Sequence, residues 1–450
     1  MPWSVSISQL LEVLCAQPIN LSEAALTQVS STIQTDTRRI EPGEVFLALR
    51  GENFDGHDFV SHAIAQGAIA AIVDSDYENA DVAVLQVRDT LQAYQQLGRW
   101  WRDRLNIPVI GVTGSVGKTT TKELIAAVLA TEGRVHKTFG NFNNEIGVPK
   151  TLLELDTEHA YAVVEMAMRG EGQIRELTQI ARPNIGVITN VGTAHIELLG
   201  SEEAIARAKC ELLAEMPEDS VAILNHDNPL LMATAQQVWS GEVVTYGLSG
   251  GDIQGVLTDN QTIKVGEMRL PLPLPGRHNA SNFLAALAVA QVLGIDWSTL
   301  QNGVKVNMPT GRSQRFTLPH DIILLDETYN AAPEAMTAAL QLLADTPGKR
   351  KIAVLGAMKE LGERSLQLHQ RVGETVQRLQ LDGLLVLVDG KDAQAIAQSA
   401  EGIPSECFTT HADLVARLKT FVQAGDRILF KAAHSVGLDR VVNQFRAEFL

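Results

Sequence analysis

A glycine-rich turn between an apolar run and a helical pattern carries the first residues whose spacing suits chemistry. The stretch GVTGSVGKTTTKE begins at Gly111 and places Lys118 and Thr119 directly after Gly117. Glycines let successive backbone N–H groups converge on phosphate oxygens, and the helix that follows presents its positive end to them. The lysine of such a loop reaches the β- and γ-phosphates, and the hydroxyl after it binds Mg²⁺. The residues predicted to hold a nucleoside triphosphate are Thr113, Gly114, Ser115, Val116, Gly117, Lys118, Thr119 and Thr120.

One position departs from the general phosphate-loop pattern. That pattern has a glycine five residues before Gly117, where this chain has Val112 between Gly111 and Gly114. The structural alternative is a strand, a turn and a helix whose glycines occur by chance. Because the strand, the turn, the Lys-Thr pair and the helix all fall in register, the sequence favours a phosphate site.

Two further side chains stand at the ends of apolar runs in the same region. Glu165 ends YAVVE, and His195 follows NIGVITNVGTA. Ligands of open α/β sheets bind beyond the carboxyl ends of the parallel strands, so both side chains are predicted at the edge that would hold the phosphates. A carboxylate there suits Mg²⁺, although a lone acid or histidine at a strand end is also common as a structural residue. The polar run GNFNNEIGVP, residues 140–149, alone predicts only a turn-rich loop.

Composition limits the class of protein. The chain has 450 residues, 45% of them hydrophobic and 20% charged, which is ordinary for a globular protein of several domains. Its formal net charge of −16 argues against nucleic acid or an anionic membrane as the main partner. Three widely spaced cysteines form no metal-ligand pair or disulfide pattern. No apolar run reaches the roughly 18 residues of a transmembrane helix and the start lacks a signal-peptide pattern, so we expect a cytoplasmic protein.

The elements that must position these residues alternate between strands and helices. Strand-like runs lie at EVFLALRG and AIAAIVD, then at IPVIGVTG, AYAVVEMAM, NIGVITNVG and VAILNHD, and again at DIILLD, KIAVLGAM, GLLVLVDG and RILFKAAHSVG. This alternation predicts an α/β fold with mainly parallel sheets that carry helices on both faces. We expect three domains, at residues 1–105, 106–311 and 312–450, the last of them Rossmann-like. The segment NGVKVNMPTGRSQR is predicted to link the second domain to the third.

A series of motifs follows in a specific order along nearly the whole chain. The order is GVTGSVGKTTTKE, GNFNNEIGVP, VVEMA, NVGTAHIELLGS, AKCEL, LNHDNP, GRHNASNFLAALA, GRSQR and DETYNAAP, preceded by TDTRRIEPGEVFLALRGENFDGHDF. This series resembles the Mur ligases, the ATP-dependent amide-forming enzymes of peptidoglycan precursor synthesis. Within that family, GNFNNEIGVP and the YNAAP segment are similar to the members that join D-alanyl-D-alanine to a UDP-N-acetylmuramoyl-tripeptide.

The resemblance implies a reaction and its cofactors. The γ-phosphoryl group of ATP passes to the terminal carboxylate of the tripeptide, and the amine of D-alanyl-D-alanine attacks the acyl phosphate, so that ADP and phosphate are released. Mg²⁺ is implied, in two ions. The resemblance also gives the three domains their tasks: UDP-muramoyl substrate binding in the first, ATP binding on a P-loop in the second, and binding of the amino substrate and part of the nucleotide in the third. We expect a monomer.

Roles for individual residues follow from the same resemblance. The implied catalytic residues are Lys118, His195, Lys209 and Arg312. The implied metal ligands are Thr119, Glu165, His195 and Lys209, the last after N-carbamoylation. Further nucleotide contacts are implied for Asn279, Asn282, Arg312, Asp326, Tyr329 and Asn330. Substrate contacts are implied for Thr37, Arg38, Asp55, Gly56, His57, Asn141, Asn143, Asn144, Lys431 and Ser435. Without the resemblance, Lys209 is typical of a lysine on the surface of a helix.

The motifs that differ from the family's usual ones all lie in residues 312–450. YNANP is replaced by YNAAP, which puts Ala332 in place of an amide, and a GDM-like segment is GAM, with Ala357 in place of a carboxylate. Near the C-terminus a KGSR-like pattern is KAAHSVGLD, in which Lys431 and Ser435 remain.

Three alternatives stay open at this level. The preceding Mur ligase, which adds the third amino acid, is disfavoured because a DNPR-type motif is absent from the sequence. A folylpolyglutamate synthetase is disfavoured because it should lack the N-terminal uridine-nucleotide block. A nucleotide-switch regulator would leave the strand-end residues Glu165 and His195, and the third domain, without a task.

Overall fold

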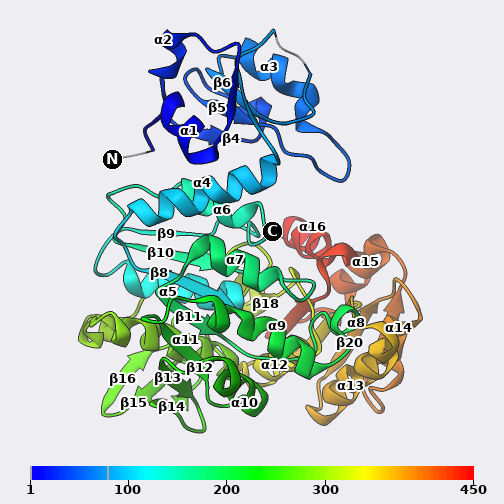
Figure 1. Ribbon diagram of the computed structural model, residues 1–450. Helices are drawn as coiled ribbons and strands as arrows, with labels where there is room; N and C mark the ends of the chain where they lie inside the picture. The colour runs from blue at the N-terminus through cyan, green and yellow to red at the C-terminus, as the bar shows by residue number, and fades with distance from the viewer. Residues whose placement is uncertain (1–2, 79–80, 450) are drawn as a thin grey trace.

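The structure is a computed structural model that describes residues 3–78 and 81–449. Figure 1 shows an N-terminal unit at the top, a central unit below it and a C-terminal unit at the lower right. Each unit is built around its own sheet. In the described residues no helix combines the length and the apolar character needed to cross a bilayer.

The N-terminal unit contains a five-stranded sheet in the order β2-β7-β6-β5-β4, parallel except for β2. Its strands are β2 (Gln17–Ile19), β4 (Ile33–Gln34), β5 (Val45–Leu47), β6 (Ala70–Asp74) and β7 (Val84–Val87), and β1 (Val5–Ser6) pairs separately with β3 (Val29–Ser30). The helices are α1 (Ile7–Leu14), α2 (Glu23–Leu26) and α3 (Val60–Ala65), with 3₁₀ turns η1 (Thr37–Arg39) and η2 (Gly56–Phe59). Helix α4 (Thr90–Arg104) packs on both α1 and the central unit, and so joins the two.

The central unit is a nine-stranded sheet in the order β16-β15-β14-β13-β12-β11-β8-β10-β9. Its strands are β8 (Val109–Thr113), β9 (Val135–Lys137), β10 (Tyr161–Glu165), β11 (Ile185–Ile188), β12 (Val221–Asn225), β13 (Glu242–Gly247), β14 (Ile253–Asp259), β15 (Thr262–Val265) and β16 (Met268–Pro271). Strands β8 to β14 run parallel, and β14 to β16 form an antiparallel extension.

Helices cover both faces of the central sheet. They are α5 (Lys118–Leu129), α6 (Gly147–Leu153), α7 (Gln173–Ala181), α8 (Ile196–Leu199), α9 (Glu202–Glu215), α10 (Pro229–Val238) and α11 (Arg277–Val292). In β10, Ala162 and Val164 belong to the core under α6, α7 and α9, whereas Val163 belongs to the core under α5 and α11. Side chains of a strand alternate between its two faces, so the run of apolar residues reports a strand buried on both sides.

The C-terminal unit has a six-stranded sheet in the order β17-β18-β22-β19-β20-β21, parallel except for β17. Its strands are β17 (Gln314–Leu318), β18 (Ile322–Asp326), β19 (Arg350–Leu355), β20 (Gly383–Leu387), β21 (Ser405–Phe408) and β22 (Asp426–Lys431). Its helices are α12 (Pro333–Asp345), α13 (Ser365–Arg378), α14 (Lys391–Gln398), α15 (His411–Phe421) and α16 (Leu438–Phe449). The 3₁₀ turns η3 (Trp297–Asn302), η4 (Pro319–Asp321), η5 (Gly362–Arg364) and η6 (His434–Val436) complete the chain.

The predicted fold class is confirmed: each large sheet is mainly parallel and is built by alternating strands and helices. The apolar runs locate ten strands, β5, β6, β8, β10, β11, β12, β18, β19, β20 and β22. The other described strands, β1 to β4, β7, β9, β13 to β17 and β21, were not predicted. Residues 303–313, all of them described, contain neither helix nor strand, in agreement with a link. The domain limits at residues 105 and 311 stay predictions.

Candidate active site

The loop between β8 and α5 has a backbone that only glycine permits at two positions. Gly114 and Gly117 have φ angles of 149° and 83°, which L side chains rarely adopt. A Cβ on Gly114 would lie 1.9 Å from Thr189 Oγ1, and one on Gly117 would lie 2.7 Å from Asn282 Oδ1. Helix α5 begins at Lys118 without a side-chain cap in the described chain, so its first N–H groups are available to an anion.

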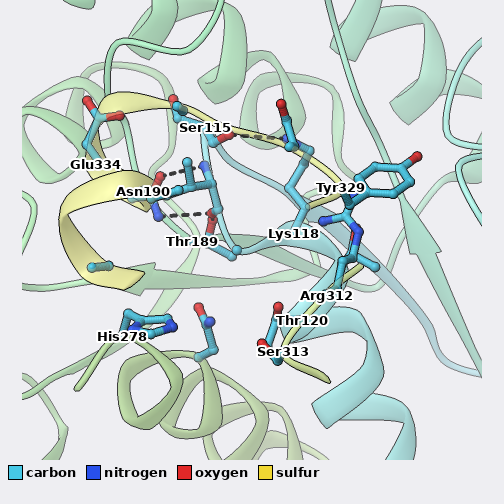
Figure 2. Close-up of a pocket in the computed structure, with 18 of the residues that line it drawn as sticks. Ser115, Lys118, Thr120, Thr189, Asn190, His278, Arg312, Ser313, Tyr329 and Glu334 are labelled. Carbon is cyan, nitrogen blue, oxygen red and sulfur yellow. Dashed lines mark hydrogen bonds between the residues drawn. The ribbon is translucent and has the colours of Figure 1, made fainter. Parts of the chain in front are cut away.

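Asn190, two residues after the end of β11, holds the loop in place through hydrogen bonds. The backbone N–H of Val116 donates to Asn190 Oδ1 at 3.0 Å, and Asn190 Nδ2 donates to the carbonyl of Val116 at 3.0 Å (Figure 2). The hydroxyl of Thr189 donates to the same carbonyl at 2.6 Å. Sequence reasoning missed both residues, although their place at a strand end was a usable signal. The loop is therefore tied to the neighbouring strand.

Lys118 extends along the loop toward the cavity. Its Nζ donates to the carbonyl of Gly114 at 2.7 Å. Burial lowers the pKa of Lys118; the carboxylate of Glu165 opposes this effect and the charge of Arg312 adds to it. Figure 2 shows Lys118 beside Arg312 and Tyr329, which come from the other side of the cavity.

Glu165 lies at the carboxyl end of β10 and is almost fully buried. Its Oε1 accepts hydrogen bonds from Thr119 Oγ1 at 3.2 Å and from Asn143 Nδ2 at 2.8 Å. Its Oε2 is buried and has no hydrogen-bond partner among the described residues. A buried carboxylate oxygen without a donor beside a hydroxyl fits a divalent cation. The described residues contain no cluster of three or more His, Cys, Asp or Glu side chains suited to a metal.

Lys122, on α5, lies close to the carboxylate of Glu165. The side chain is completely buried, and its Nζ donates to the carbonyl of Thr138 at 2.7 Å. The same Nζ lies 3.1 Å from Glu123 Oε1 and 3.7 Å from Glu165 Oε2. Sequence reasoning gave Lys122 no role. Its position four residues after Lys118, one helical turn further on, was the only signal.

His195 and Lys209 lie beside the same site. His195 precedes α8, with Nδ1 2.5 Å from Glu360 Oε2. Burial, together with the charges of Lys118 and Lys209, lowers the pKa of His195 against the opposing effect of Glu360. Lys209, on α9, is 1% exposed and its Nζ has no hydrogen-bond or ion-pair partner in the part of the chain that the structure describes. The surface position expected without the family resemblance is therefore wrong, and burial holds the pKa of Lys209 well below its usual range.

The C-terminal unit contributes a stack of side chains. The guanidinium of Arg312 lies over the ring of Tyr329, 3.9 Å from its centroid, and Tyr329 stacks on His434 with 5.4 Å between centroids. Lys431, at the end of β22, donates from Nζ to the carbonyl of Asn330 at 2.8 Å. Burial lowers the pKa of Lys431.

These groups meet around a cavity of about 480 Å³ between the central and C-terminal units. The predicted site residues that line it are Ser115, Val116, Gly117, Lys118, Thr119, Thr120, Asn141, Asn143, Glu165, His195, Asn279, Asn282, Arg312, Tyr329, Asn330 and Lys431. Lining residues that sequence reasoning missed include Thr189, Asn190, Asn225, His278, Ser281, Glu327 and Glu334. Residues as far apart in the sequence as Ser115 and Lys431 are thus brought together.

Six of the residues predicted in the central and C-terminal units do not line the cavity: Thr113, Gly114, Asn144, Lys209, Asp326 and Ser435. Asp326 is buried, and its Oδ1 accepts from Thr328 Oγ1 at 2.6 Å and from the Thr328 N–H at 3.1 Å. The next residue, Glu327, lines the cavity instead, because neighbouring side chains at a strand end point to opposite sides. Ser435 is exposed on η6.

The predicted uridine-nucleotide residues lie in the N-terminal unit, apart from the cavity. Arg38, next to Thr37 on η1, pairs with Asp36 at 2.7 Å and has an 85% exposed side chain. His57 is buried: its Nδ1 lies 2.6 Å from Asp55 Oδ1, and its Nε2 accepts from the Asp74 N–H at 2.9 Å. Both ring nitrogens are thus engaged within the unit. The roles of Thr37, Arg38, Asp55, Gly56 and His57 stay predictions.

Comparison with known proteins gives matches along most of the chain. The Mur ligase middle domain matches residues 112–290, the Mur ligase glutamate ligase domain matches residues 311–434, and the Mur ligase family catalytic domain matches residues 30–102. A UDP-N-acetylmuramoyl-tripeptide–D-alanyl-D-alanine ligase from Synechocystis is 57% identical over 444 residues, covering 98% of this chain and 97% of its own.

Solved structures agree. A crystal structure of MurF from Acinetobacter baumannii has a TM-score of 0.89 at 31% identity and covers 99% of this chain and 100% of its own. MurF ligase from Thermotoga maritima in complex with ADP has a TM-score of 0.84 at 31% identity, with 93% and 97% covered. On these matches, this chain belongs to the Mur ligase family.

Proposed function

We propose that this chain is an ATP-dependent ligase that joins D-alanyl-D-alanine to the terminal carboxylate of UDP-N-acetylmuramoyl-tripeptide in peptidoglycan synthesis. The observation that carries the proposal is the cavity where the phosphate loop, Glu165 and His195 face Arg312 and Lys431. The 57% identity to a ligase of that name over nearly the full length supports the choice of substrates. The ADP complex of a structural relative supports ATP as the nucleotide. Location in the cytoplasm and a monomeric state remain predictions.

The reaction divides into two steps. A carboxylate oxygen of the tripeptide attacks the γ-phosphorus of ATP, the bond to the bridging oxygen breaks, and ADP leaves. The amine nitrogen of D-alanyl-D-alanine then attacks the acyl carbon, the carbon–oxygen bond to phosphate breaks, and the nitrogen loses a proton. Activation is needed because a free carboxylate is a poor electrophile with a poor leaving group.

The residues of the cavity suit the first step. The uncapped N–H groups at the start of α5 and the Lys118 ammonium would hold the phosphates from the central unit, and Arg312 would add a cation from the C-terminal unit. Asn141 and Asn143 line the same cavity, where their amides would bind the peptide. Closure between the two units would keep water from the acyl phosphate.

Thr119 and Glu165 are the residues that would hold Mg²⁺, since the hydroxyl and the unpartnered Oε2 lie together at the phosphate loop. His195 would serve a second ion, because its lowered pKa favours the neutral imidazole that binds metals. Bound there, Mg²⁺ would neutralise charge on the phosphates.

Lys209 is suited to N-carbamoylation. Its amine is buried without a partner, and its depressed pKa favours the uncharged form that reacts with carbon dioxide. The product is an anion, which would relieve the repulsion between Lys209 and Lys118. Mass spectrometry of the intact active protein tests this step: a bare amine in fully active protein would contradict it.

A phosphate-release assay tests the whole proposal. UDP-muramoyl dipeptide and tripeptide are each combined with a free amino acid or with D-alanyl-D-alanine, in the presence of ATP and Mg²⁺. We expect release only with the tripeptide and D-alanyl-D-alanine together. Release with the dipeptide and a free amino acid would indicate the preceding ligase, and release without any peptide would indicate a nucleotide switch.

A further inference from the structure

Residues 192–197, which follow β11 and include the start of α8, form what we call the His195 segment. It belongs to the central unit but is held by two carboxylates of the C-terminal unit, Glu334 at the start of α12 and Glu360 after β19. These contacts cross the boundary between the two units. The site residues described so far give neither glutamate a role.

Glu334 binds the beginning of the segment. Its Oε1 accepts from the Thr193 N–H at 2.8 Å and from Thr193 Oγ1 at 2.9 Å. Gly192 permits this approach, because a Cβ there would lie 2.8 Å from the same oxygen. Figure 2 shows Glu334 at the rim of the cavity, on the side of Ser115 and Asn190. The start of α12 is therefore docked directly on the segment.

Glu360 binds the middle and the end of the segment. Its Oε2 lies 2.5 Å from His195 Nδ1, and its carbonyl accepts from the Glu197 N–H at 3.4 Å. Gly362 packs against Glu197, since a Cβ on it would lie 3.3 Å from the Glu197 Cα. The contact thus includes backbone as well as side chains.

Both partners of this contact have a backbone conformation that is energetically unfavourable for residues other than glycine. His195 has a φ of 66° and Glu360 a φ of 61°, both in the left-handed region that residues other than glycine seldom adopt. Such conformations persist where the surrounding structure requires them, and they gather at functional sites. Here strained backbone occurs on both partners of a single contact between units.

The contact between Glu360 and His195 affects which nitrogen of the imidazole carries the proton. Glu360 Oε2 lies 2.5 Å from Nδ1 without the alignment of a hydrogen bond among the described residues, so it acts on the ring as a neighbouring negative charge. A carboxylate beside Nδ1 favours the tautomer with its proton on that nitrogen, which leaves the lone pair of Nε2 for a ligand. The direction of the ring is then set by Glu360. Because Glu360 and Glu334 belong to the C-terminal unit, the ring is set only when that unit is docked.

We propose that Glu334 and Glu360 are positioning residues that orient His195 for the reaction when the C-terminal unit docks on the central unit. The inference rests on the proposed function, in which His195 acts at the transferred phosphate. It adds a coupling between closure and the placement of a catalytic group, a type of step that commonly limits turnover.

The first test is a double-mutant cycle. Glu360→Ala is compared with Glu363→Ala, an exposed glutamate of the same loop, each made in the wild type and in a His195→Asn background. We expect Glu360→Ala to lower kcat by about 10- to 100-fold, as loss of a metal ligand's carboxylate partner does, with KM for ATP changed less than twofold. Glu363→Ala stays within twofold of the wild type. In the His195→Asn background, Glu360→Ala lowers kcat by less than twofold further, because its effect passes through the imidazole.

Glu334 is tested by a conservative rescue. Glu334→Ala removes both bonds to Thr193 and should lower kcat about tenfold, whereas Glu334→Gln keeps an acceptor oxygen and should recover most of the activity. An equal loss in both variants would contradict a role through Thr193. Should Glu360→Ala fail to fold, Glu360→Gln, which removes the charge at His195, takes its place in the cycle.

Scattering in solution separates this inference from the proposed function. With ADP bound, the Glu334→Ala/Glu360→Ala protein should have a larger radius of gyration than the wild type or Glu363→Ala. An unchanged radius, or equal losses of kcat from Glu360→Ala in both backgrounds, would overturn the inference even if the wild type has the proposed activity. A wild type that releases no phosphate with tripeptide and D-alanyl-D-alanine would overturn the proposed function, while the radii still decide whether the glutamates hold the units together.

Discussion

The two walls of the cavity differ in how they are built. The central wall consists mainly of the loop and helix start at residues 115–120 and of residues at or just beyond strand ends, such as Glu165 and Asn190. The C-terminal wall consists of side chains from separate loops, strand ends and helix α12, among them Arg312, Glu327 and Lys431. The first wall depends on backbone shape that nearby glycines specify, and the second depends on how one unit docks on another.

The first prediction concerns the central wall at its most important side chain. Lys118→Ala removes the ammonium that we propose holds the phosphates of ATP, so ATP turnover should fall by about a thousandfold, as for loss of a charge that acts on the transferred phosphoryl group. Circular dichroism and the melting temperature should stay close to those of the wild type. Lys305→Ala, at an exposed lysine of the link, is the matched control. Turnover in Lys118→Ala above a tenth of the wild-type rate would mean that the loop has another role.

The second prediction tests whether backbone shape specifies the central wall. Gly114→Ala places a Cβ against Thr189 Oγ1 and forces an L residue to a φ of 149°, so we expect a loss of about 2–3 kcal/mol in the free energy of unfolding. Urea denaturation measures it. Gly170→Ala, where a Cβ meets nothing within 4 Å, should change that free energy by less than about 1 kcal/mol. If both variants lose the same free energy of unfolding, the conformation of the loop does not depend on glycine at residue 114.

These differences explain which parts the sequence predicted. The loop, Glu165 and the α/β fold depend on local patterns: glycine spacing, apolar runs and strand ends. Asn190 was missed although it follows a strand end. Glu334 and Glu360 were missed because each acts across 140 or more residues of sequence, and no local pattern marks such a contact. The burial of Lys209 is of the same kind, since helix α9 alone is compatible with an exposed lysine.

The third prediction sharpens the assignment on the C-terminal wall. The sequence indicated Asp326 as a nucleotide contact, whereas Glu327 is the residue that lines the cavity. Glu327→Gln should raise KM for ATP about tenfold, equivalent to about 1.4 kcal/mol of lost binding. Asp326→Asn should leave KM within twofold, because its carboxylate is engaged by Thr328. Steady-state kinetics at saturating UDP-muramoyl tripeptide and D-alanyl-D-alanine measure both KM values. A larger rise in KM for Asp326→Asn than for Glu327→Gln would restore Asp326 as the contact.

The smallest predicted effect is a pH-dependent change of stability at Asp326. Burial raises the pKa of this carboxyl above its usual value, while the hydrogen bonds from Thr328 oppose the rise. A raised pKa in the folded state means that the fold favours the neutral acid. The ionised carboxyl therefore lowers the free energy of unfolding at pH values above its pKa in the folded state. This loss disappears below its pKa in the unfolded state, about 3.9. Asp326→Asn is neutral at every pH and keeps an acceptor for Thr328. It should therefore raise the free energy of unfolding at pH 7 by about 1 kcal/mol or less, with the gain vanishing toward pH 3.5. If the free energy of unfolding rises by the same amount at every pH, the gain does not come from the charge of Asp326. The buried carboxylate of Asp326 would then already be stabilised by its surroundings in the C-terminal unit, as that of Glu165 is in the central unit.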